Sequence, residues 1–366
     1  MKRKMIVGIV LLSCLVAGCT AYTCLPKFGG IPKNERVRKV DGSPNYRDGH
    51  FQNIHETSQL TESFWTAIFQ SSSKRKIPKN EIPTVKANLS ELNPQENILV
   101  WFGHSSYYFQ VEGKRFLVDP VFSHYASPVS FINRAFKGTN ICKAADIPDI
   151  DYLVITHDHW DHLDYPTIKE LKPRIRKVIC PMGVGAHFAR WNFDESTIIE
   201  MDWEDRVVLD TCFEMHCFPA RHFSGRGFFN QRQSLWASFL LKSDNLSIYM
   251  GGDSGYDTHF ASIGERFDSI DFALLENGQY NKAWKYIHMQ PEETLQAGID
   301  LRAKNVIPVH HSKFALSRHS WDEPLIRINT ANEKLKTPRL LTPQIGEIVF
   351  LKDTMQTFSK WWQNVE

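Results

Sequence analysis

Short runs of apolar residues, each followed by a polar cluster, dominate the chain from about residue 97 onward. Runs of this kind predict buried β-strands. They lie at 98–111, 115–122, 152–156, 177–181, 213–220, 234–242, 246–252, 272–276, 305–310 and 347–351. The first two runs flank a Glu112-Gly113-Lys114 turn, so we predict that they form a hairpin.

Segments with helical periodicity lie between these runs. The clearest is PEETLQAGIDLRA at 291–303, in which Pro291 suits a first helical turn. Glu292 and Glu293 follow it, where the positive end of the helix dipole favours carboxylates. No internal repeat is present. Strands and helices in mixed order predict a layered α/β domain with two central sheets, which we place at residues 94–366.

The first 18 residues have the layout of a signal peptide, with basic residues, then a short apolar run, then small residues. Val16-Ala17-Gly18-Cys19 resembles the bacterial lipobox, at which Cys19 becomes a lipidated first residue. An uncleaved membrane anchor is the alternative, but the apolar run from Met5 to Ala17 is short for a bilayer core of about 30 Å. Cys14 offers a weaker cleavage site. We therefore expect a lipid-anchored protein of the cell envelope, and Thr20 after the cysteine points to an outer membrane.

Residues 19–93 are rich in Pro, Gly, Ser, Asn and Lys and show no long period. We interpret them as a tether and wrap-around extension. Within it, Leu60–Gln70 predicts one short amphipathic helix. The basic run at 74–76 could contact anionic headgroups, or it could be a solvated loop.

Composition narrows the function classes. Of 366 residues, 43 are basic and 41 acidic, so the net charge of +2 excludes a general affinity for nucleic acid. Of the seven cysteines, five remain once Cys14 is removed and Cys19 is lipidated. Their odd number and irregular spacing predict neither a disulfide framework nor a zinc finger. Buried apolar positions are expected for them, most clearly for Cys180 and Cys217.

The stretch VITHDHWDHLD, from Val154 to Asp164, carries the candidate chemistry. It follows a predicted buried strand, so its side chains can converge beyond the strand end. His157 and His159 are two residues apart and can point the same way from extended backbone. Asp161 and His162 follow as the chain turns and can face a different centre. Imidazole and carboxylate groups in this number suit zinc.

His-x-His-x-Asp-His resembles the signature of the metallo-β-lactamase superfamily. That resemblance implies an αββα sandwich, two central mixed β-sheets flanked by helices, with two Zn²⁺ ions at one edge. It also implies that a later histidine completes the first metal site, an aspartate bridges both metals and a last histidine completes the second. The matching positions are His222 in CFPARHFSGRG, Asp253 in IYMGGDSGY and His310 in VIPVHHSKFAL. The neighbouring His311 is the alternative last ligand, and we choose His310 because Phe-Ala-Leu begins four residues later.

Further segments resemble one branch of that superfamily, the N-acylphosphatidylethanolamine-hydrolysing phospholipase D enzymes and their bacterial relatives. They are WFGHSSYYFQV, FLVDPVFSHYASP, THDHWDHLDY, FPARHFSGR, GGDSGY, KYIHMQPEE and HHSKFALSRHSWDEPL. Trp160 and Lys313 depart from the branch pattern. The resemblance implies catalytic roles beside the metals for Asp119, which could orient or deprotonate water, and His288, which could protonate the leaving oxygen or hold a phosphate oxygen. Turn capping by Asp119 and a helix-entry hydrogen bond of His288 are the alternatives. His104 suits a supporting role.

The expected function is a membrane-anchored zinc phosphodiesterase in which a metal-bridging hydroxide attacks a phospholipid. His159 favours a hydrolase, since relatives that hold two irons for redox chemistry usually carry glutamate there. An apolar groove for lipid could be lined by Phe223, Phe228, Phe229, Trp284 and Tyr286. The alternatives are a lactonase or phosphoester hydrolase acting on a small phosphorylated substrate, recognised by a closed basic pocket, and a non-catalytic envelope lipoprotein. The pattern does not indicate an oligomeric state.

Overall fold

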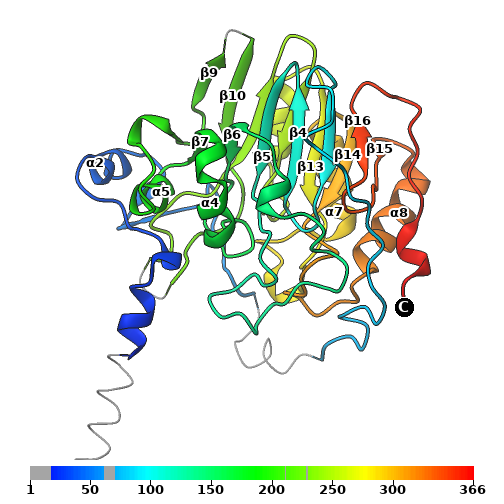
Figure 1. Cartoon of the computed structure of the whole chain (residues 1–366), viewed down its shortest axis with the longest axis horizontal. Coiled ribbons are helices and arrows are strands. Elements are labelled where there is room, and N and C mark those ends of the chain that lie inside the picture. The colour runs from blue at the N-terminus through cyan, green and yellow to red at the C-terminus, as the bar shows by residue number, and fades with distance from the viewer. Residues whose placement is uncertain (1–17, 62–70, 211, 228–229) are drawn as a thin grey trace, which may run out of the picture.

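The computed structural model describes residues 18–61, 71–210, 212–227 and 230–366. Two sheets stand face to face, with helices on their outer sides (Figure 1). The predicted signal peptide lies outside the described residues except for Gly18, and the predicted Leu60–Gln70 helix lies outside them beyond Thr61. Both stay predictions, as do the domain boundaries at 18 and 93. Among the residues that are described, none belongs to a helix with the length and apolar content needed to cross a bilayer.

The first sheet has seven strands, and its second half is parallel. Its order is β16 (Ile348–Phe350), β3 (Ile98–Trp101), β4 (Tyr107–Val111), β5 (Lys114–Val118), β6 (Ile150–Val154), β7 (Ile175–Pro181) and β8 (Ile198–Met201). Pairing is antiparallel from β16 to β5 and parallel from β5 to β8.

The second sheet also has seven strands, with its parallel part at one end. Its order is β15 (Arg339–Leu340), β14 (Ala303–Val309), β13 (Ile270–Glu276), β12 (Ser247–Met250), β11 (Ser238–Lys242), β10 (Phe213–Phe218) and β9 (Arg206–Asp210). Strands β12 to β15 pair in parallel and β9 to β12 pair antiparallel. In an open sheet with parallel strands, functional side chains gather beyond the carboxyl ends of those strands.

The helices divide between the two outer faces. Those on the first sheet are α4 (Tyr165–Leu171) and α5 (Gly185–Arg190), and those on the second are α6 (His259–Arg266), α7 (Pro291–Asp300) and α8 (Glu323–Leu335). The N-terminal extension adds η1 (Pro26–Phe28), α2 (Glu35–Asp41), β1 (Tyr46–Arg47) and β2 (His50–Phe51). The remaining 3₁₀ turns are η2 (Ala144–Asp146), η3 (Lys172–Arg174), η4 (Glu195–Thr197), η5 (Lys282–Trp284) and η6 (Trp361–Asn364).

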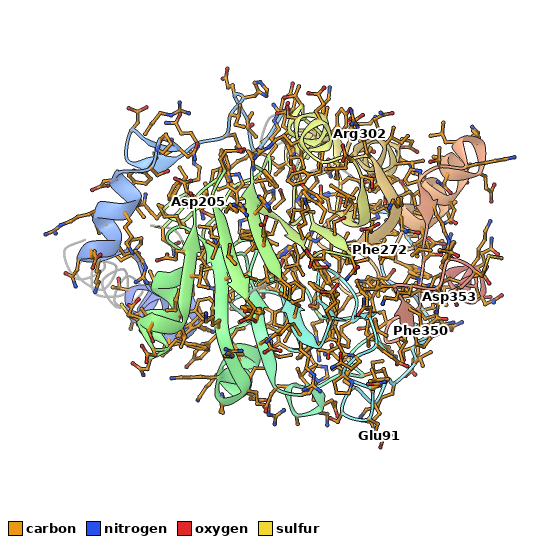
Figure 2. All side chains as sticks on the ribbon, turned by 90° about the horizontal axis from the view of Figure 1, so that it is seen from above. Glu91, Asp205, Phe272, Arg302, Phe350 and Asp353 are labelled. Atoms are coloured by element: carbon orange, nitrogen blue, oxygen red, sulfur yellow. The ribbon has the colours of Figure 1, made fainter. Side chains whose placement is uncertain are left out.

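Three apolar layers hold the sandwich together. Phe109 and Phe116 of the first sheet belong to the same buried cluster as Phe239 and Phe272 of the second. Figure 2 shows Phe272 among side chains in the interior, while labelled charged residues such as Arg302 lie at the periphery. Separate clusters lie under α4 and α5, and under α6 and α7. Because both faces of each sheet are covered, the central strands are continuous apolar runs without alternation. The predicted αββα fold is confirmed.

The first predicted hairpin is built differently from the prediction. The run at 98–111 is two strands, since Gly103 and His104 have φ values of 83° and 53° and turn the chain between β3 and β4. The second turn is as expected: Glu112 and Gly113, with φ of 49° and 79°, connect β4 to β5. Two successive residues with positive φ make the short turn that suits the twist of a hairpin.

Edge strands are the other departure from the sequence prediction. Strands β8, β9 and β15 were not expected, because they are short and only partly buried. The predicted helix at 291–303 is present as α7, where the Gln290 N–H donates to Glu293 Oε2 at 2.8 Å. Cys180 and Cys217 are fully buried, as expected, but Cys24 is exposed and Cys142 and Cys212 are half-buried, so the expectation of buried positions is wrong for these three. The described cysteines are all free.

Candidate metal centre

One edge of the sandwich brings all seven predicted metal ligands together. His157 to His162 follow β6, His222 follows β10, Asp253 follows β12 and His310 follows β14. Six of these side chains are buried, and His159 is half-buried. Residues that are up to about 150 positions apart in the chain therefore share one site because the ends of strands from both sheets meet there.

Three histidines form the first cluster, which we define as His157, His159 and His222. The His159 Nδ1 atom lies 2.9 Å from His157 Nε2 and 3.2 Å from His222 Nε2. Asp253 Oδ2 is 3.9 Å from His157 Nε2 and 3.7 Å from His222 Nε2. Burial, together with the neighbouring imidazoles, holds the pKa of His157 and His222 well below the ordinary value. Both rings are therefore neutral, which is the form that binds a metal.

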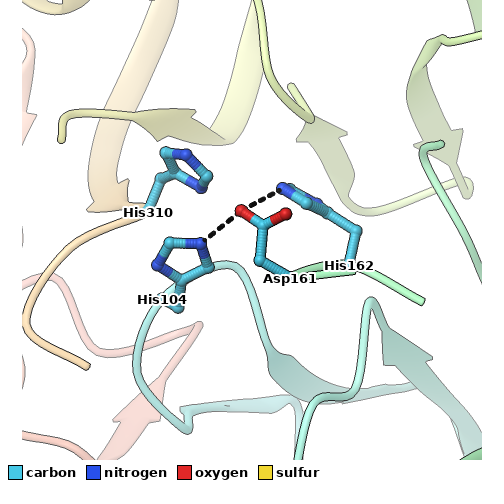
Figure 3. Close-up of side chains that lie close together, drawn as sticks. All are labelled: His104, Asp161, His162 and His310. Atoms are coloured by element: carbon cyan, nitrogen blue, oxygen red, sulfur yellow. Dashed lines mark hydrogen bonds and ion pairs between the residues drawn. The ribbon is translucent and has the colours of Figure 1, made fainter. Parts of the chain in front are cut away.

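The second cluster, which we define as Asp161, His162 and His310, adjoins the other oxygen of Asp253. Asp253 Oδ1 lies 3.1 Å from His162 Nε2 and 3.2 Å from His310 Nδ1. Asp161 Oδ2 is 3.6 Å from His162 Nε2 (Figure 3). Asp253 thus contributes one oxygen to each cluster, which is the placement of a bridging ligand.

Unpartnered buried atoms test whether these residues fit a metal. His162 Nε2, Asp253 Oδ1 and His310 Nε2 are buried, and none makes a well-aligned hydrogen bond among the described residues, although His162 Nε2 and Asp253 Oδ1 lie 3.1 Å apart. Buried polar atoms are nearly always satisfied, so a group of orphaned nitrogen and oxygen atoms aimed at one region indicates an ion that they would coordinate. Imidazole nitrogens and carboxylate oxygens are the donors that zinc accepts. The donor set therefore fits metal ions.

Asp119 lies behind the second cluster and not in the open pocket. Its Oδ2 is 2.8 Å from His162 Nδ1 and accepts a hydrogen bond from the Thr156 hydroxyl at 2.6 Å, while Oδ1 accepts from the Thr156 N–H at 2.9 Å. The side chain is 1% exposed. The expectation that Asp119 orients or deprotonates water does not match this geometry. The carboxylate instead orients His162 so that Nε2 faces the site, a common arrangement behind metal-binding histidines.

His288 lies in the pocket beside both clusters. Its ring centroid is 5.1 Å from that of His222 and 5.4 Å from that of His310. Its Nδ1 is 2.7 Å from Glu276 Oε2, and Glu276 Oε1 accepts from the Met289 N–H at 2.6 Å. Burial raises the pKa of Glu276 well above its ordinary value and lowers that of His288. The pair is therefore arranged to share a proton between Glu276 and Nδ1 of His288.

The two adjacent histidines at the end of β14 differ in environment. His311 Nδ1 is bonded to Ser312 Oγ at 2.7 Å and its Nε2 to the Pro308 carbonyl at 3.1 Å, so both of its ring nitrogens are engaged away from the clusters. His310 Nδ1 lies 2.9 Å from Ser105 Oγ and its Nε2 is unpartnered. The geometry favours His310 over His311 as the ligand.

His104 supports the second cluster, in line with the supporting role suggested by its sequence position. Its Nε2 lies 2.9 Å from Asp161 Oδ2 (Figure 3). His104, Asp119 and His310 all have positive φ, at 53°, 41° and 65°. Non-glycine residues seldom adopt this conformation, and they do so chiefly where surrounding structure enforces it at functional sites.

A pocket of about 300 Å³ opens onto the clusters. The described residues that line it are Gln59, Leu60, His159, Asp161, His222, Phe223, Asp253, Trp284, Ile287, His288 and Leu316. Two of the aromatic residues expected there, Phe223 and Trp284, do line it. Tyr286 does not: its ring lies 4.4 Å from the Arg221 guanidinium instead. Phe228 and Phe229 lie outside the described residues.

Several supporting residues were not found by sequence reasoning. Glu276, Ser105, Asp158 and Arg226 each contact a candidate ligand, the catalytic candidate His288 or the turn that carries the ligands. Glu276 could have been noticed as a charged residue closing the apolar run FALLE. Asp158 lies inside the ligand-rich stretch but received no role there. Ser105 and Arg226 carry no local signal, because a single Ser or Arg in a loop is ordinarily solvated.

Comparisons with known proteins agree with this geometry. Residues 114–311 match the family described as "Beta-lactamase superfamily domain". An uncharacterized protein of Mycobacterium tuberculosis is 37% identical over 339 residues, covering 89% of this chain and 90% of that protein. The N-acyl-phosphatidylethanolamine-hydrolyzing phospholipase D 1 of Caenorhabditis elegans is 27% identical over 315 residues, covering 79% of this chain and 87% of that one.

A solved structure supports the fold. A metallo hydrolase from the archaeon Ignicoccus hospitalis superposes with a TM-score of 0.54 at 22% identity, covering 70% of this chain and 98% of that one. The family match spans both clusters up to His311, and the buried His and Asp groups lie where they can hold metal. The chain therefore belongs to the metallo-β-lactamase superfamily, as a metal-dependent hydrolase related to the N-acylphosphatidylethanolamine-hydrolysing phospholipases D.

Proposed function

We propose that this protein is a zinc-dependent phosphodiesterase of phospholipase D type that hydrolyses N-acylphosphatidylethanolamine-like phospholipids. The observation that carries the proposal is the mixed lining of the pocket. It combines His288 and four candidate ligands with the apolar side chains of Leu60, Phe223, Trp284, Ile287 and Leu316. A phosphodiester with acyl chains needs both kinds of side chain.

The lining also supports the lipid substrate over a small phosphorylated one. A small phosphorylated substrate would need basic residues to neutralise its charge. No lysine or arginine is among the described residues around the pocket. Drug-sized and lipid ligands favour pockets that are mostly apolar with a few placed polar groups, which matches this pocket. The similarity to the C. elegans phospholipase supports the same substrate class.

The chain's own residues would act as follows. The first cluster with Asp253 would hold one Zn²⁺ and the second cluster with Asp253 the other, and the pair would supply Lewis acidity and water with a pKa near neutrality. Glu276 fixes Nδ1 of His288, so that Nε2 can give a proton to the leaving alkoxide or bind a phosphate oxygen. Phe223 and Trp284 would exclude bulk water beside the scissile phosphate.

Product analysis tests this proposal. Zinc-loaded protein is incubated with a panel of phospholipids, a simple lactone and a small phosphodiester, and products are identified by mass spectrometry. Release of phosphatidate and N-acylethanolamine is expected, with loss of release in Asp253→Asn. Metal-loaded protein that cleaves only the lactone or the small diester would overturn the lipid proposal. Metal-loaded protein that is inactive on the whole panel would favour a binding role.

We also propose that the protein is a lipoprotein of the cell envelope, held by Cys19. Cys19 is exposed at the start of the described chain, and the lipobox-like residues precede it. Mass spectrometry of the N-terminal peptide from membranes is expected to find diacylglyceryl-Cys19 as the first residue. Membrane extracts in which the mature chain retains residues before Cys19 would contradict this.

A further inference from the structure

The N-terminal extension contacts the metal-binding turn directly. Its segment Cys24–Gly30, which we call the strap, is fixed at one end to α5. Arg190 Nη2 donates to the Cys24 carbonyl at 2.6 Å, and Trp191 Nε1 donates to the Pro26 carbonyl at 2.8 Å. These bonds hold the strap alongside the turn that carries His157 and His159.

Arg226 joins the strap to that turn. Its Nε and Nη2 donate to the Lys27 carbonyl at 3.2 and 2.9 Å. Its Nη1 donates to the carbonyls of Asp158 at 2.8 Å and Leu163 at 2.6 Å, which lie on either side of His159 to His162. A planar guanidinium presents these donors in a fixed arrangement. The Arg226 side chain therefore fixes the distance between the two ends of the turn, and also the distance from the turn to the strap.

The burial of Arg226 makes the strap necessary to this arrangement. Its side chain is 2% exposed, and burial lowers its pKa to about 10. Its guanidinium lies 4.1 Å from the centre of the Trp160 ring, and Phe28 of the strap packs T-shaped against the same ring with centroids 5.2 Å apart. A buried cation is tolerated only when its donors are bonded. Without the Lys27 carbonyl two of those donors would be left without a partner.

A second connection runs through His187. The Gly30 N–H donates to His187 Nδ1 at 3.0 Å, which leaves the proton on Nε2, 2.9 Å from Asp158 Oδ2. Asp158 Oδ1 then accepts from the Gly225 N–H at 2.7 Å, in the loop that carries His222. Gly29 permits this approach, because a Cβ at that position, with φ of 73°, would lie 1.9 Å from His187 Nδ1.

A third connection reaches His222 itself. Asn53 Nδ2 donates to the His222 carbonyl at 2.8 Å, and the His222 N–H donates to Asn53 Oδ1 at 3.2 Å. The Trp236 indole N–H donates to the same oxygen at 3.0 Å and fixes the amide. The extension therefore hydrogen-bonds both the backbone N–H and the backbone carbonyl of His222, a residue of the first cluster.

We infer that Arg226, Asn53 and the strap are positioning groups that hold the first cluster in the geometry its metal needs. The extension is then a structural part of the metal centre and not only a connection to the membrane. Asp119, His104 and Ser105, which contact ligands of the second cluster, come from the sandwich itself. Arg226 also spans the turn that carries Asp161 and His162. Loss of the extension's contacts should therefore weaken the first-cluster metal more than the second.

The test measures metal release from full-length, zinc-loaded protein with a chromogenic chelator. Arg226→Lys keeps the positive charge but loses the planar arrangement of several donors. Asn53→Ala removes both hydrogen bonds to the His222 backbone. We expect one zinc per chain to leave about 10- to 100-fold faster in Arg226→Lys, the range found for residues that orient metal ligands, and less so in Asn53→Ala. In cobalt-loaded protein the visible absorption bands should shift.

Arg36→Met is the matched control. Arg36 also ties the extension to the sandwich, through Glu195 at 2.7 Å and Glu200 at 2.5 Å, but it does not touch the metal-binding turn. Its release rates and cobalt spectrum should equal those of the wild type. Wild-type release from both Arg226→Lys and Asn53→Ala, or equal acceleration by Arg36→Met, would overturn the inference. If Arg226→Lys does not fold, the rate of zinc release from Asn53→Ala, a change at a half-buried position, decides whether the inference holds. None of these readouts depends on the lipid substrate.

Discussion

The two halves of the metal centre are supported by different parts of the chain. The second cluster is backed by side chains at the ends of the sandwich's own strands, Asp119 behind His162 and His104 behind Asp161. The first cluster also has ring partners in the domain, Thr156 Oγ1 beside His157 Nδ1 and the Ile287 carbonyl beside His222 Nδ1. The backbone that carries it is bonded to the extension as well, through Arg226 to the Lys27 carbonyl and directly to the Asn53 side chain. The first half therefore depends on the extension as well as on the domain, whereas the ring contacts of the second half come from the domain.

The largest effect should come from removing the residue that both halves share. Asp253→Asn takes a charged oxygen from each cluster, so both metals should bind less tightly and hydrolysis should fall at least about 1,000-fold, because metal stabilisation of developing charge contributes several kcal/mol. Elemental analysis and turnover check this. If Asp253→Asn keeps the full zinc content and normal turnover, Asp253 is not the bridging ligand.

Replacing the proton-sharing histidine should separate chemistry from metal binding. His288→Ala is expected to lower kcat by about 10²- to 10³-fold, in the range for a positioned acid or base, while zinc content stays at the wild-type level. Glu276→Gln, which keeps the shape of the side chain, should cause a smaller loss in the same direction. A fall in zinc content that matches the fall in kcat would make His288 a ligand and extend one of the clusters.

Asp119→Asn should affect the second half alone. Its amide can still approach Thr156 but cannot stabilise His162 as the carboxylate does, so we expect a 10- to 100-fold loss of activity with selective loss of the second-cluster metal. Chelator kinetics on Asp119→Asn and Arg226→Lys should identify different ions. If both variants release the same ion, the two halves do not have separate supports.

The smallest effect concerns the aromatic contact between the strap and the turn. Phe28→Leu and Trp160→Phe each weaken the edge-on packing of Phe28 against Trp160. A double-mutant cycle of unfolding free energies should give a coupling of about 0.5–1.5 kcal/mol, the usual value for an aromatic pair. A coupling near zero would mean that the strap is held by its hydrogen bonds alone.

Much of the fold was readable because burial leaves a local signal. Strands covered on both faces, such as β6 and β13, contain continuous apolar runs after the aspartate at their second position, and α7 begins at the proline that predicted it. The break at Gly103 and His104 was missed because apolar residues continue on both sides of it. Strand β8 was missed because an edge strand need bury only part of its surface.

The candidate site divides in the same way. The spacing of His157, His159, Asp161 and His162 made a metal site predictable, because ligands close in sequence at a strand end converge with little help from the rest of the chain. The choice of His310 over His311 rested on a resemblance, and the geometry now favours it because the ring nitrogens of His311 are bonded elsewhere. Asp119 was placed near the site, but the sequence did not show that its carboxylate contacts His162 and Thr156.

The sequence by itself determined the layered α/β class and the four candidate ligands between His157 and His162, because apolar runs and ligand spacing are local properties. His222, Asp253 and His310 followed from the resemblance to the superfamily. Only the tertiary structure decided what supports those ligands. Arg226, Asn53 and Lys27 look like ordinary solvated loop residues in the sequence, and their importance comes from contacts across about 170 to 200 positions. Such contacts depend on how the extension packs on the sandwich, and no local pattern of residues encodes that packing.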